Sequence, residues 1–363
     1  MANQMVPPSS VVLGAGLMGR LLACELARQG HSVSLFDAAG PDAQGSAARV
    51  AAAMLAPLAE SAVTEAPVVQ MGQYALGRWP EMLRELEQPV FFQQEGTLIL
   101  WHRQDAPEAA RFTRQLEATQ RQMPTLPQSQ AVNSAQIAAL EPALANRFAQ
   151  GLYLPLEGQL DNRQLLNALL HQLQQLQVQL HWNNPRAPGD FSPGQTGQPD
   201  RVFDCRGLGA RPDWAALRGV RGEVIRLHAP EVHLTRPVRL IHPRYPLYIA
   251  PKPDHLFVVG ATEIESDDMS PASVRSTLEL LSAAYAVHSG FAEARIIEIA
   301  TQCRPALPDN LPSIRLLGER TIQINGLYRH GFLVAPALLD VVMELVQSGQ
   351  SALAGRFSLS IGP

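Results

Sequence analysis

The sequence predicts an α/β fold (α+β overall), in which a Rossmann-like dinucleotide-binding domain is joined to a second domain built on a mostly antiparallel β-sheet. The 363 residues exceed what one ordinary core needs and suit two domains. Residues 11–37 follow a strand–helix–strand pattern with a glycine-rich turn, which is typical of a Rossmann-like unit. Residues 222–262 contain mostly short strand-like segments, which indicates a second sheet.

The N-terminal unit carries a GxGxxG fingerprint between an apolar strand and an amphipathic helix. Its first glycine permits a tight turn, its second lets the backbone approach a pyrophosphate, and its third lets the helix pack on the strand. An acidic residue about 20 positions on, Asp37, is placed to bind ribose hydroxyls. The motif does not distinguish FAD from NAD. The residues expected around the phosphates are Gly14, Gly16, Leu17, Met18 and Gly19.

The remaining elements follow in order from hydrophobic periodicity. Helices are expected over residues 68–86, 107–122, 165–176, 274–287 and 336–346, and a short helix within residues 128–139. Strands are expected over residues 91–92, 97–101, 201–205, 223–227, 247–250, 256–260 and 294–301. The alanine-rich stretch 45–58 is compatible with a helix that packs closely on a flat surface, and Pro336 is expected in the first turn of the last helix, where its missing amide hydrogen is harmless.

Composition and charge argue against several classes of protein. A net charge of −4 gives no basic surface for nucleic acid. The longest apolar stretches are interrupted by charges and the N-terminal residues lack a signal-like core, so we expect no stable membrane anchoring. Cys24, Cys205 and Cys303 lie far apart and the histidines are scattered, which predicts no metal site and fits a reducing, cytoplasmic location.

Several later segments resemble the FAD-dependent D-amino-acid oxidase family, and within it the thiamine-pathway glycine oxidases. The similarity is collinear from about residue 10 to residue 347. The segments that carry it read AAAMLAP (51–57), RGEV (221–224), YIAP (248–251), VVGATE (258–263), RPALPDNLP (304–312) and YRHGFLVAP (328–336).

The resemblance implies a discontinuous domain layout and noncovalently bound FAD. The FAD-binding domain would comprise residues 1–80, 145–222 and 300–363, and the substrate domain residues 81–144 and 223–299, whose sheet covers the flavin. A family cysteine that tethers flavin in some relatives lies one residue out of register with Cys303, which is therefore expected to be structural. The further cofactor contacts implied are Ala53, Met54, Gly207, Gly331, Phe332 and Leu333.

The resemblance also implies a substrate site. Arg304 corresponds to the arginine that binds the substrate carboxylate, and a planar guanidinium suits that task. Tyr248 corresponds to a tyrosine that hydrogen-bonds the same carboxylate, and Arg329 to a second arginine beside the flavin. Glu263 either lines the site or solvates a strand end. The sequence departs from the family pattern at Ala53, where the family has glycine.

The leading functional hypothesis is oxidative deamination of glycine or a small amino acid, with hydride transfer to FAD and reoxidation by dioxygen to give hydrogen peroxide. The family further implies thiamine thiazole synthesis, thiazole synthase as a partner, and a homo-oligomer. One alternative is a D-amino-acid or N-methyl-amino-acid dehydrogenase that uses another electron acceptor. Another is a non-catalytic dinucleotide-binding protein, against which Arg304 and Tyr248 argue.

Overall fold

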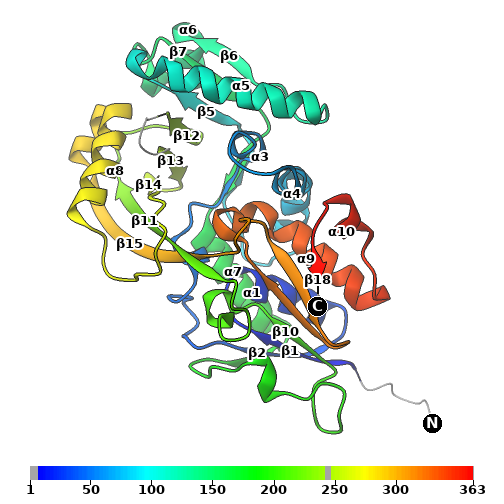
Figure 1. Ribbon diagram of the computed structural model, residues 1–363. Coiled ribbons are helices and arrows are strands. Elements are labelled where there is room, and N and C mark those ends of the chain that lie inside the picture. Colours follow the sequence, from blue (N-terminus) through cyan, green and yellow to red (C-terminus); the bar gives the residue numbers. More distant parts are fainter. Residues whose placement is uncertain (1–6, 242–246, 363) are drawn as a thin grey trace.

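The computed structural model describes residues 7–241 and 247–362. Within them the chain forms two large β-sheets, flanked by helices and joined by two long strands (Figure 1). A three-stranded sheet of β3 (Met54–Leu55), β8 (Gly158–Leu160) and β4 (Phe92–Gln93) lies between them in the strand order β3-β8-β4. This arrangement confirms the predicted fold class, a Rossmann-like unit with a second, mostly antiparallel sheet.

The first large sheet has seven strands in the order β18-β16-β17-β10-β1-β2-β9. Its central strands are parallel, as expected for a Rossmann-like unit. Residues on alternate positions face opposite sides, so Val12 packs on helices while Val11 and Leu13 pack on the other face. The strands are β1 (Ser9–Leu13), β2 (Ser32–Phe36), β9 (Gln179–His181), β10 (Arg201–Asp204), β16 (Ser313–Leu317), β17 (Thr321–Asn325) and β18 (Ile361–Gly362).

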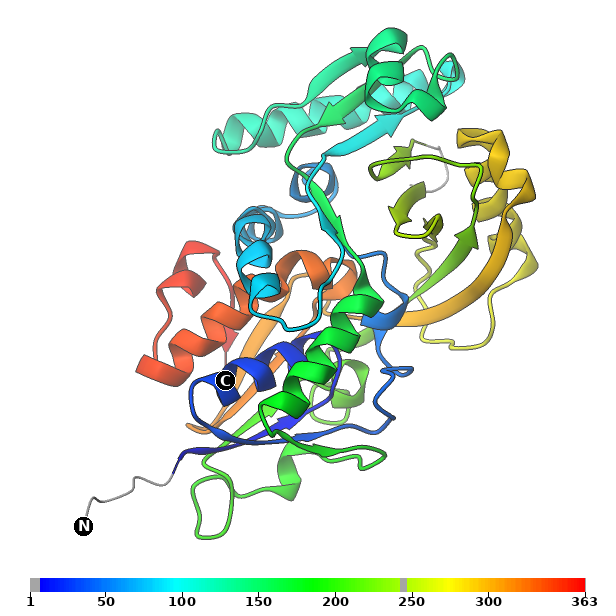
Figure 2. The ribbon, with the colours of Figure 1, turned by 180° about the vertical axis from the view of Figure 1, so that it is seen from behind.

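Four apolar helices pack into the largest core of the molecule, against one face of this sheet. They are α1 (Leu17–Arg28), α4 (Ala66–Arg84), α7 (Asn162–Gln175) and α9 (Gly331–Ser348). Figure 2 shows α1 in blue, α7 in green and α9 in orange-red side by side on this face. The short α10 (Ala352–Arg356) packs on α9. The glycine turn therefore sits at the edge of a rigid helix–sheet body.

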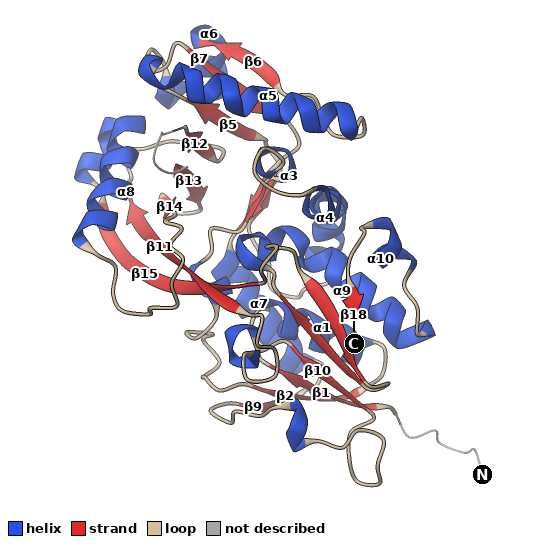
Figure 3. Cartoon of the chain, in the orientation of Figure 1, coloured by secondary structure: helices blue, strands red, loops and turns tan. Residues whose placement is uncertain are grey.

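The second large sheet has eight strands in the order β15-β11-β14-β13-β12-β5-β7-β6, and only β12 and β5 pair in parallel (Figure 3). The helices α5 (Ala106–Gln122), α6 (Ser134–Leu140) and α8 (Val274–Val287) pack against it. Its strands are β5 (Thr97–Leu100), β6 (Gln130–Asn133), β7 (Gln150–Leu154), β11 (Arg218–His228), β12 (Val238–Leu240), β13 (Leu247–Lys252), β14 (Leu256–Gly260) and β15 (Arg295–Ala306).

The paired strands β11 and β15 run from the eight-stranded sheet toward the seven-stranded one (Figure 1). The predicted domain boundaries at 222/223 and 299/300 fall inside these two strands. The predicted layout, with three segments in the FAD-binding domain and two in the substrate domain, stays a prediction. The two strands nevertheless link the sheets directly, so residues on β15 reach the space between them.

One of two local predictions was wrong. The alanine-rich stretch 45–58 is not one helix but α2 (Ala47–Val50), an extended segment with β3, and α3 (Pro57–Glu60). Ala53 has a positive φ of 52°, which interrupts a right-handed helix. The short helix expected within residues 128–139 is present as α6, which follows β6 and begins after Asn133, the residue that caps it in a capping box with Gln136.

The last helix also differs from its prediction, because it begins at Gly331 and Pro336 lies inside it. A proline at this position cannot donate to the carbonyl four residues earlier, which belongs to Phe332. The indole Nε1 of Trp79, from α4, donates to that carbonyl instead, at 2.9 Å. The tertiary contact therefore replaces the missing helical hydrogen bond.

Residues Tyr328–Ser348 include the one helix of the described ranges that is long and apolar enough to cross a membrane, with a mean hydropathy of 1.5. This differs from the expectation that no stretch reaches that length. Of the most apolar part of this helix, 67% is buried inside the protein, where α9 packs against α1 and α4. Such burial is typical of the core helix of a globular protein.

Candidate active site

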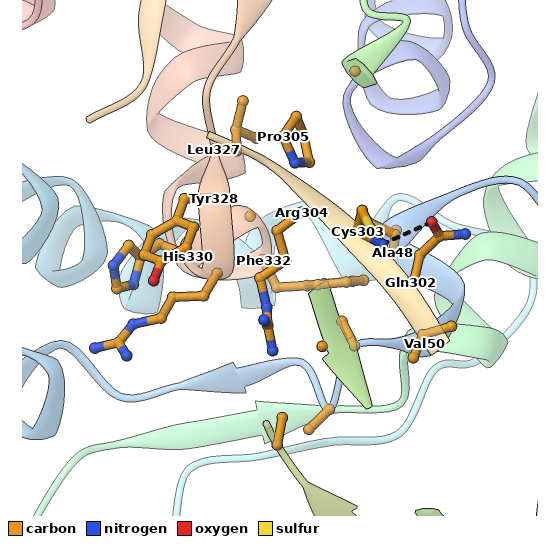
Figure 4. A pocket seen from close by; sticks show the side chains of 18 of the residues that line it. Ala48, Val50, Gln302, Cys303, Arg304, Pro305, Leu327, Tyr328, His330 and Phe332 are labelled. Atoms are coloured by element: carbon orange, nitrogen blue, oxygen red, sulfur yellow. Dashed lines mark hydrogen bonds between the residues drawn. The ribbon is translucent and has the colours of Figure 1, made fainter. Parts of the chain in front are cut away.

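A cavity of about 1250 Å³ extends from the glycine turn to the inner face of the eight-stranded sheet. Every residue predicted for the site lines it except Gly19, which lies behind the turn. Figure 4 shows Arg304, Tyr328, His330 and Phe332 around one part of the cavity. Segments that are far apart in the sequence thus meet here, although the role of each residue stays a prediction.

The glycine turn after β1 has the conformation that the fingerprint predicts. Gly14 has a φ of 91°, and a Cβ there would lie 2.7 Å from the carbonyl oxygen of Cys205. A Cβ at Gly19 would overlap the carbonyl oxygen of Gly14, so this glycine permits the helix to approach the turn. Asp37 accepts hydrogen bonds from the amides of Ala15 and Ala39. Its carboxylate therefore lies against the turn.

Arg20 was not predicted, yet it supports the same turn. Its side chain is completely buried and donates to the carbonyl oxygens of Ala15 at 2.7 Å, Leu166 at 2.7 Å and Pro41 at 2.6 Å. Burial lowers the pKa of Arg20 to about 10, which still leaves it charged at neutral pH. An arginine within the otherwise apolar start of α1 was the available signal.

Arg304 and Tyr248 line the end of the cavity that the eight-stranded sheet forms, on β15 and β13. The guanidinium of Arg304 donates to the carbonyl oxygens of Arg221 at 3.3 Å and Thr262 at 3.2 Å. A Cβ at Gly222 would overlap this guanidinium. The glycine of the RGEV segment therefore makes room for Arg304.

A second glycine accommodates the tyrosine. A Cβ at Gly260 would lie 2.6 Å from the hydroxyl of Tyr248 on the neighbouring strand. Burial raises the pKa of Tyr248, so its hydroxyl keeps the proton that it can donate. The VVGATE segment thus shapes the space in which the ring lies.

Two carboxylates neutralise two other arginines at this end. Glu60 contacts Arg239 at 2.6 Å and Arg329 at 3.0 Å, and Glu263 contacts Arg329 at 2.9 Å. Burial alone would favour protonated Glu60, but these two arginines and His330 hold its pKa well below the usual range. The Glu60 carboxylate in turn raises the pKa of Arg329 further. Glu263 therefore lines the site, where the sequence left two roles open.

The three arginines are thus not equivalent. Arg239 and Arg329 each contact a carboxylate, whereas Arg304 contacts only backbone carbonyl oxygens in the ranges 7–241 and 247–362. Of these three arginines, Arg304 is therefore the one whose positive charge is not paired with a carboxylate of the described residues and can meet an anionic group in the cavity. Glu60 and Arg239 were missed because a lone glutamate at the end of a short helix and a lone arginine in a strand carry no motif.

His330 was also missed. It is almost fully buried, 3.5 Å from Glu60 through Nδ1 and 3.5 Å from Thr64 through Nε2. Burial lowers its pKa to about 4, so the ring is neutral at physiological pH. The histidine therefore lines the cavity beside Tyr328 without adding a charge.

Two helices begin at the cavity without a side-chain cap, α1 at Leu17 and α9 at Gly331. Their first backbone N–H groups have no partner within the helix, and the helix dipole adds partial positive charge there. One helix start therefore suits a pyrophosphate, and the other suits an anionic ring oxygen. Gly331, Phe332 and Leu333 line the second of these, as predicted.

Comparison with known proteins bears on this geometry. A family model described as DAO, FAD dependent oxidoreductase, matches residues 10–345. The chain belongs to this family. It is 41% identical to a Rhizobium etli protein provisionally named thiamine biosynthesis oxidoreductase ThiO, over 94% of this chain and 97% of that protein. The predicted family and its FAD cofactor are confirmed.

Two further DAO-family proteins show how the chain compares. A Trichormus variabilis protein named bifunctional protein ThiO/ThiG is 24% identical and spans 96% of this chain, which matches only 54% of that longer protein. The crystal structure of glycine oxidase from Geobacillus kaustophilus superposes with a TM-score of 0.79 at 24% identity, covering 97% of this chain and 98% of that one. The structural match supports the fold of this DAO-family member.

The cavity of this DAO-family chain fits FAD. Its two uncapped helix starts provide donors for a pyrophosphate and for a ring oxygen, and its volume of about 1250 Å³ exceeds that of sites for ordinary small ligands. Cys303 also lines it, but its thiol contacts the carbonyl oxygens of Ser266 and Asp268, and burial raises its pKa. A protonated thiol that donates hydrogen bonds to carbonyl oxygens is a poor nucleophile, which favours noncovalent binding of FAD.

Proposed function

We propose that this protein oxidises glycine or another small amino acid on FAD. The observation that carries the proposal is Arg304, whose charge is not neutralised by a carboxylate in the described chain and lies at the same end of the cavity as Tyr248. A cation and a hydroxyl donor are the groups that recognise a substrate carboxylate. The names of relatives agree with this: a ThiO at 41% identity and a glycine oxidase from Geobacillus kaustophilus at 24%.

The residues divide the task between them. Bound FAD supplies the acceptor for a hydride from the substrate carbon. Arg304 binds the substrate carboxylate, and the Tyr248 hydroxyl donates a second hydrogen bond to it. Together they fix the orientation of the carbon–hydrogen bond. The apolar residues Val224, Ala250 and Val258 pack together beneath Tyr248, and Val224 of this group lines the cavity.

The names of the relatives support a proposal for the electron acceptor and the fate of the product. We propose dioxygen as the acceptor, which gives hydrogen peroxide, and use of the imine in thiamine thiazole synthesis. The fused ThiO/ThiG relative supports a link to a thiazole-forming partner. A dehydrogenase that passes electrons to another acceptor is the second candidate, since the same carboxylate-binding site would serve it.

One experiment tests the proposal. The purified protein is mixed without oxygen with glycine, sarcosine or D-alanine while the flavin absorbance is followed, and air is then admitted. We expect bleaching by at least one of them, followed by reoxidation and hydrogen peroxide. Bleaching that air does not reverse, but a quinone does, would favour the dehydrogenase. A flavin that no amino acid bleaches would refute the proposal.

A further inference from the structure

Lys252 places a buried amino group just outside the cavity, at the end of β13. Its Nζ donates to the carbonyl oxygen of Leu160 at 2.7 Å, that of Ala52 at 2.9 Å and Oε1 of Gln159 at 3.1 Å. Three acceptors match the three protons of an ammonium, whereas a neutral amine could donate only two. Burial lowers the pKa of Lys252 to about 7, and these oxygens favour the charged form.

The peptide group that Lys252 contacts belongs to the cavity wall. Ala52, Ala53 and Met54 line the cavity, and Lys252 does not. The Ala52–Ala53 peptide is trans, so its N–H points opposite to its C=O. Because that C=O points to Lys252, the N–H of Ala53 points away from the lysine, toward the cavity.

This N–H needs a partner. Ala53 is almost completely buried, and its N–H has no hydrogen-bond acceptor within the described part of the chain. The carbonyl oxygen of Ala53 accepts a hydrogen bond from the N–H of Leu160 at 3.1 Å. The peptide groups before and after Ala53 are therefore both fixed by hydrogen bonds, and Ala53 itself has a positive φ of 52°. An amide that faces the cavity without an acceptor from the chain is free to donate to a group bound there.

We propose that Lys252 is a positioning residue for the flavin: it anchors the Ala52–Ala53 peptide so that the N–H of Ala53 donates to the bound ring. Its fixed positive charge, one peptide group behind the ring, also favours the reduced, negatively charged flavin. This inference rests on FAD occupying the cavity beside Ala53 and Met54. It does not depend on which amino acid is oxidised.

The test compares three variants below pH 7, where the wild-type lysine is charged. Lys252→Met removes the charge and all donors, and we expect FAD binding to the apoprotein to weaken at least tenfold and the flavin potential to become more negative. Lys252→Gln keeps hydrogen-bond donors but not the charge. It should therefore restore the affinity for FAD more fully than it restores the reduction potential of the flavin. Lys252→Arg should recover much of both.

A control separates positioning from general stability. Arg236 is another largely buried cation, bound to Glu141 and to the carbonyls of Leu140 and Glu95, and it does not line the cavity. Arg236→Met should lower the melting temperature without changing the flavin potential. If Lys252→Met and Lys252→Gln only lower the melting temperature, with unchanged potential and FAD affinity, the inference is wrong. No substrate enters these measurements, so they remain valid whichever substrate is oxidised.

Discussion

Arg304 is the side chain on which substrate binding is expected to depend most. Replacing it with alanine removes a two-point, charge-assisted contact, which contributes roughly 2 to 5 kcal/mol when one partner of a desolvated pair is lost. We expect kcat/KM for the best amino acid to fall by about 30-fold to several thousand-fold. FAD should stay bound, because the glycine turn at Gly14 lies at the other end of the cavity.

The substrate series supplies the control for this variant. Amines without a carboxylate should be oxidised at similar rates by the wild type and Arg304→Ala. Lysine at this position should recover only part of the loss, since it keeps the charge but not the planar fork. Unchanged kcat/KM for the amino acid would show that Arg304 does not bind the carboxylate.

Gly222 provides an independent test of the same geometry. A methyl group at Gly222 would overlap the Arg304 guanidinium, so Gly222→Ala should displace it and lower kcat/KM at least tenfold, with FAD retained. Gly77→Ala, inside α4 with no atom within 4 Å of the added Cβ, is the matched control. It should leave activity unchanged and stabilise the fold by up to about 1 kcal/mol. Equal activities for both variants would contradict the proposed packing.

His330 predicts a specific dependence of stability on pH. Its pKa falls from the ordinary value of 6.5 to about 4 in the folded protein, so between these values the unfolded chain binds a proton that the folded one does not. Stability therefore decreases as the pH falls from 6.5 to 4, by about 3 kcal/mol from this group. Above pH 6.5 the ring is neutral in both states and contributes no slope.

Urea unfolding of the wild type and His330→Gln at several pH values measures this effect. The variant should lose less stability than the wild type between pH 6.5 and 4, because glutamine does not titrate. Parallel curves for the two proteins would mean that His330 is not held neutral by the fold.

At the scale of elements, α9 depends on α4 for one of its hydrogen bonds. Trp79→Phe would leave the carbonyl of Phe332 without a donor, at a cost of about 1–3 kcal/mol of unfolding free energy. Because Phe332 lines the cavity, FAD binding should weaken as well.

Trp101→Phe is the control for this element. The Trp101 indole Nε1 is buried and has no partner within the described residues, so its loss removes no hydrogen bond. Denaturant unfolding and FAD titration should show a defect in Trp79→Phe alone. A similar loss in both variants would indicate that ring size, and not the hydrogen bond, matters.

At the scale of the whole molecule, one surface stands out. Large exposed apolar side chains gather on α8, β15 and the segment before them: Met269, Val274, Leu278, Tyr285, Ile296, Ile297 and Ile299. β15 is also an outer strand of its sheet, so its free backbone groups can pair with another strand. An identical strand from a second copy can pair antiparallel about a two-fold axis, so we expect a dimer, or a tetramer that contains it.

Light scattering tests this expectation. Leu278→Glu and Ile297→Lys should shift the protein toward monomer at micromolar concentration. Leu156→Glu, at an exposed leucine outside this surface, should not. A wild-type protein that is monomeric under the same conditions would remove the prediction.

The sequence alone determined the features that depend on near neighbours. The GxGxxG turn, the strand that follows α1 and the acid at Asp37 are specified within 30 residues, and their backbone requirements are strict. The whole-chain resemblance then identified the family, FAD and several of the residues that line the cavity, because motif order survives as a collinear pattern. Arg304 and Tyr248 could be chosen in this way before any distance was known.

Only the tertiary structure decided how charges and hydrogen bonds are shared within the site. Glu60 meets Arg239 from 179 positions away, Trp79 reaches Phe332 across 253, and Lys252 reaches Ala52 across 200. No local pattern encodes such partners, because each side chain has many candidate partners of suitable chemistry until the backbone brings one within about 3 Å. The sequence pointed to Arg304 and Arg329 but not to Arg239, and the tertiary structure pairs Arg239 and Arg329 with Glu60 while Arg304 has no carboxylate partner among the described residues.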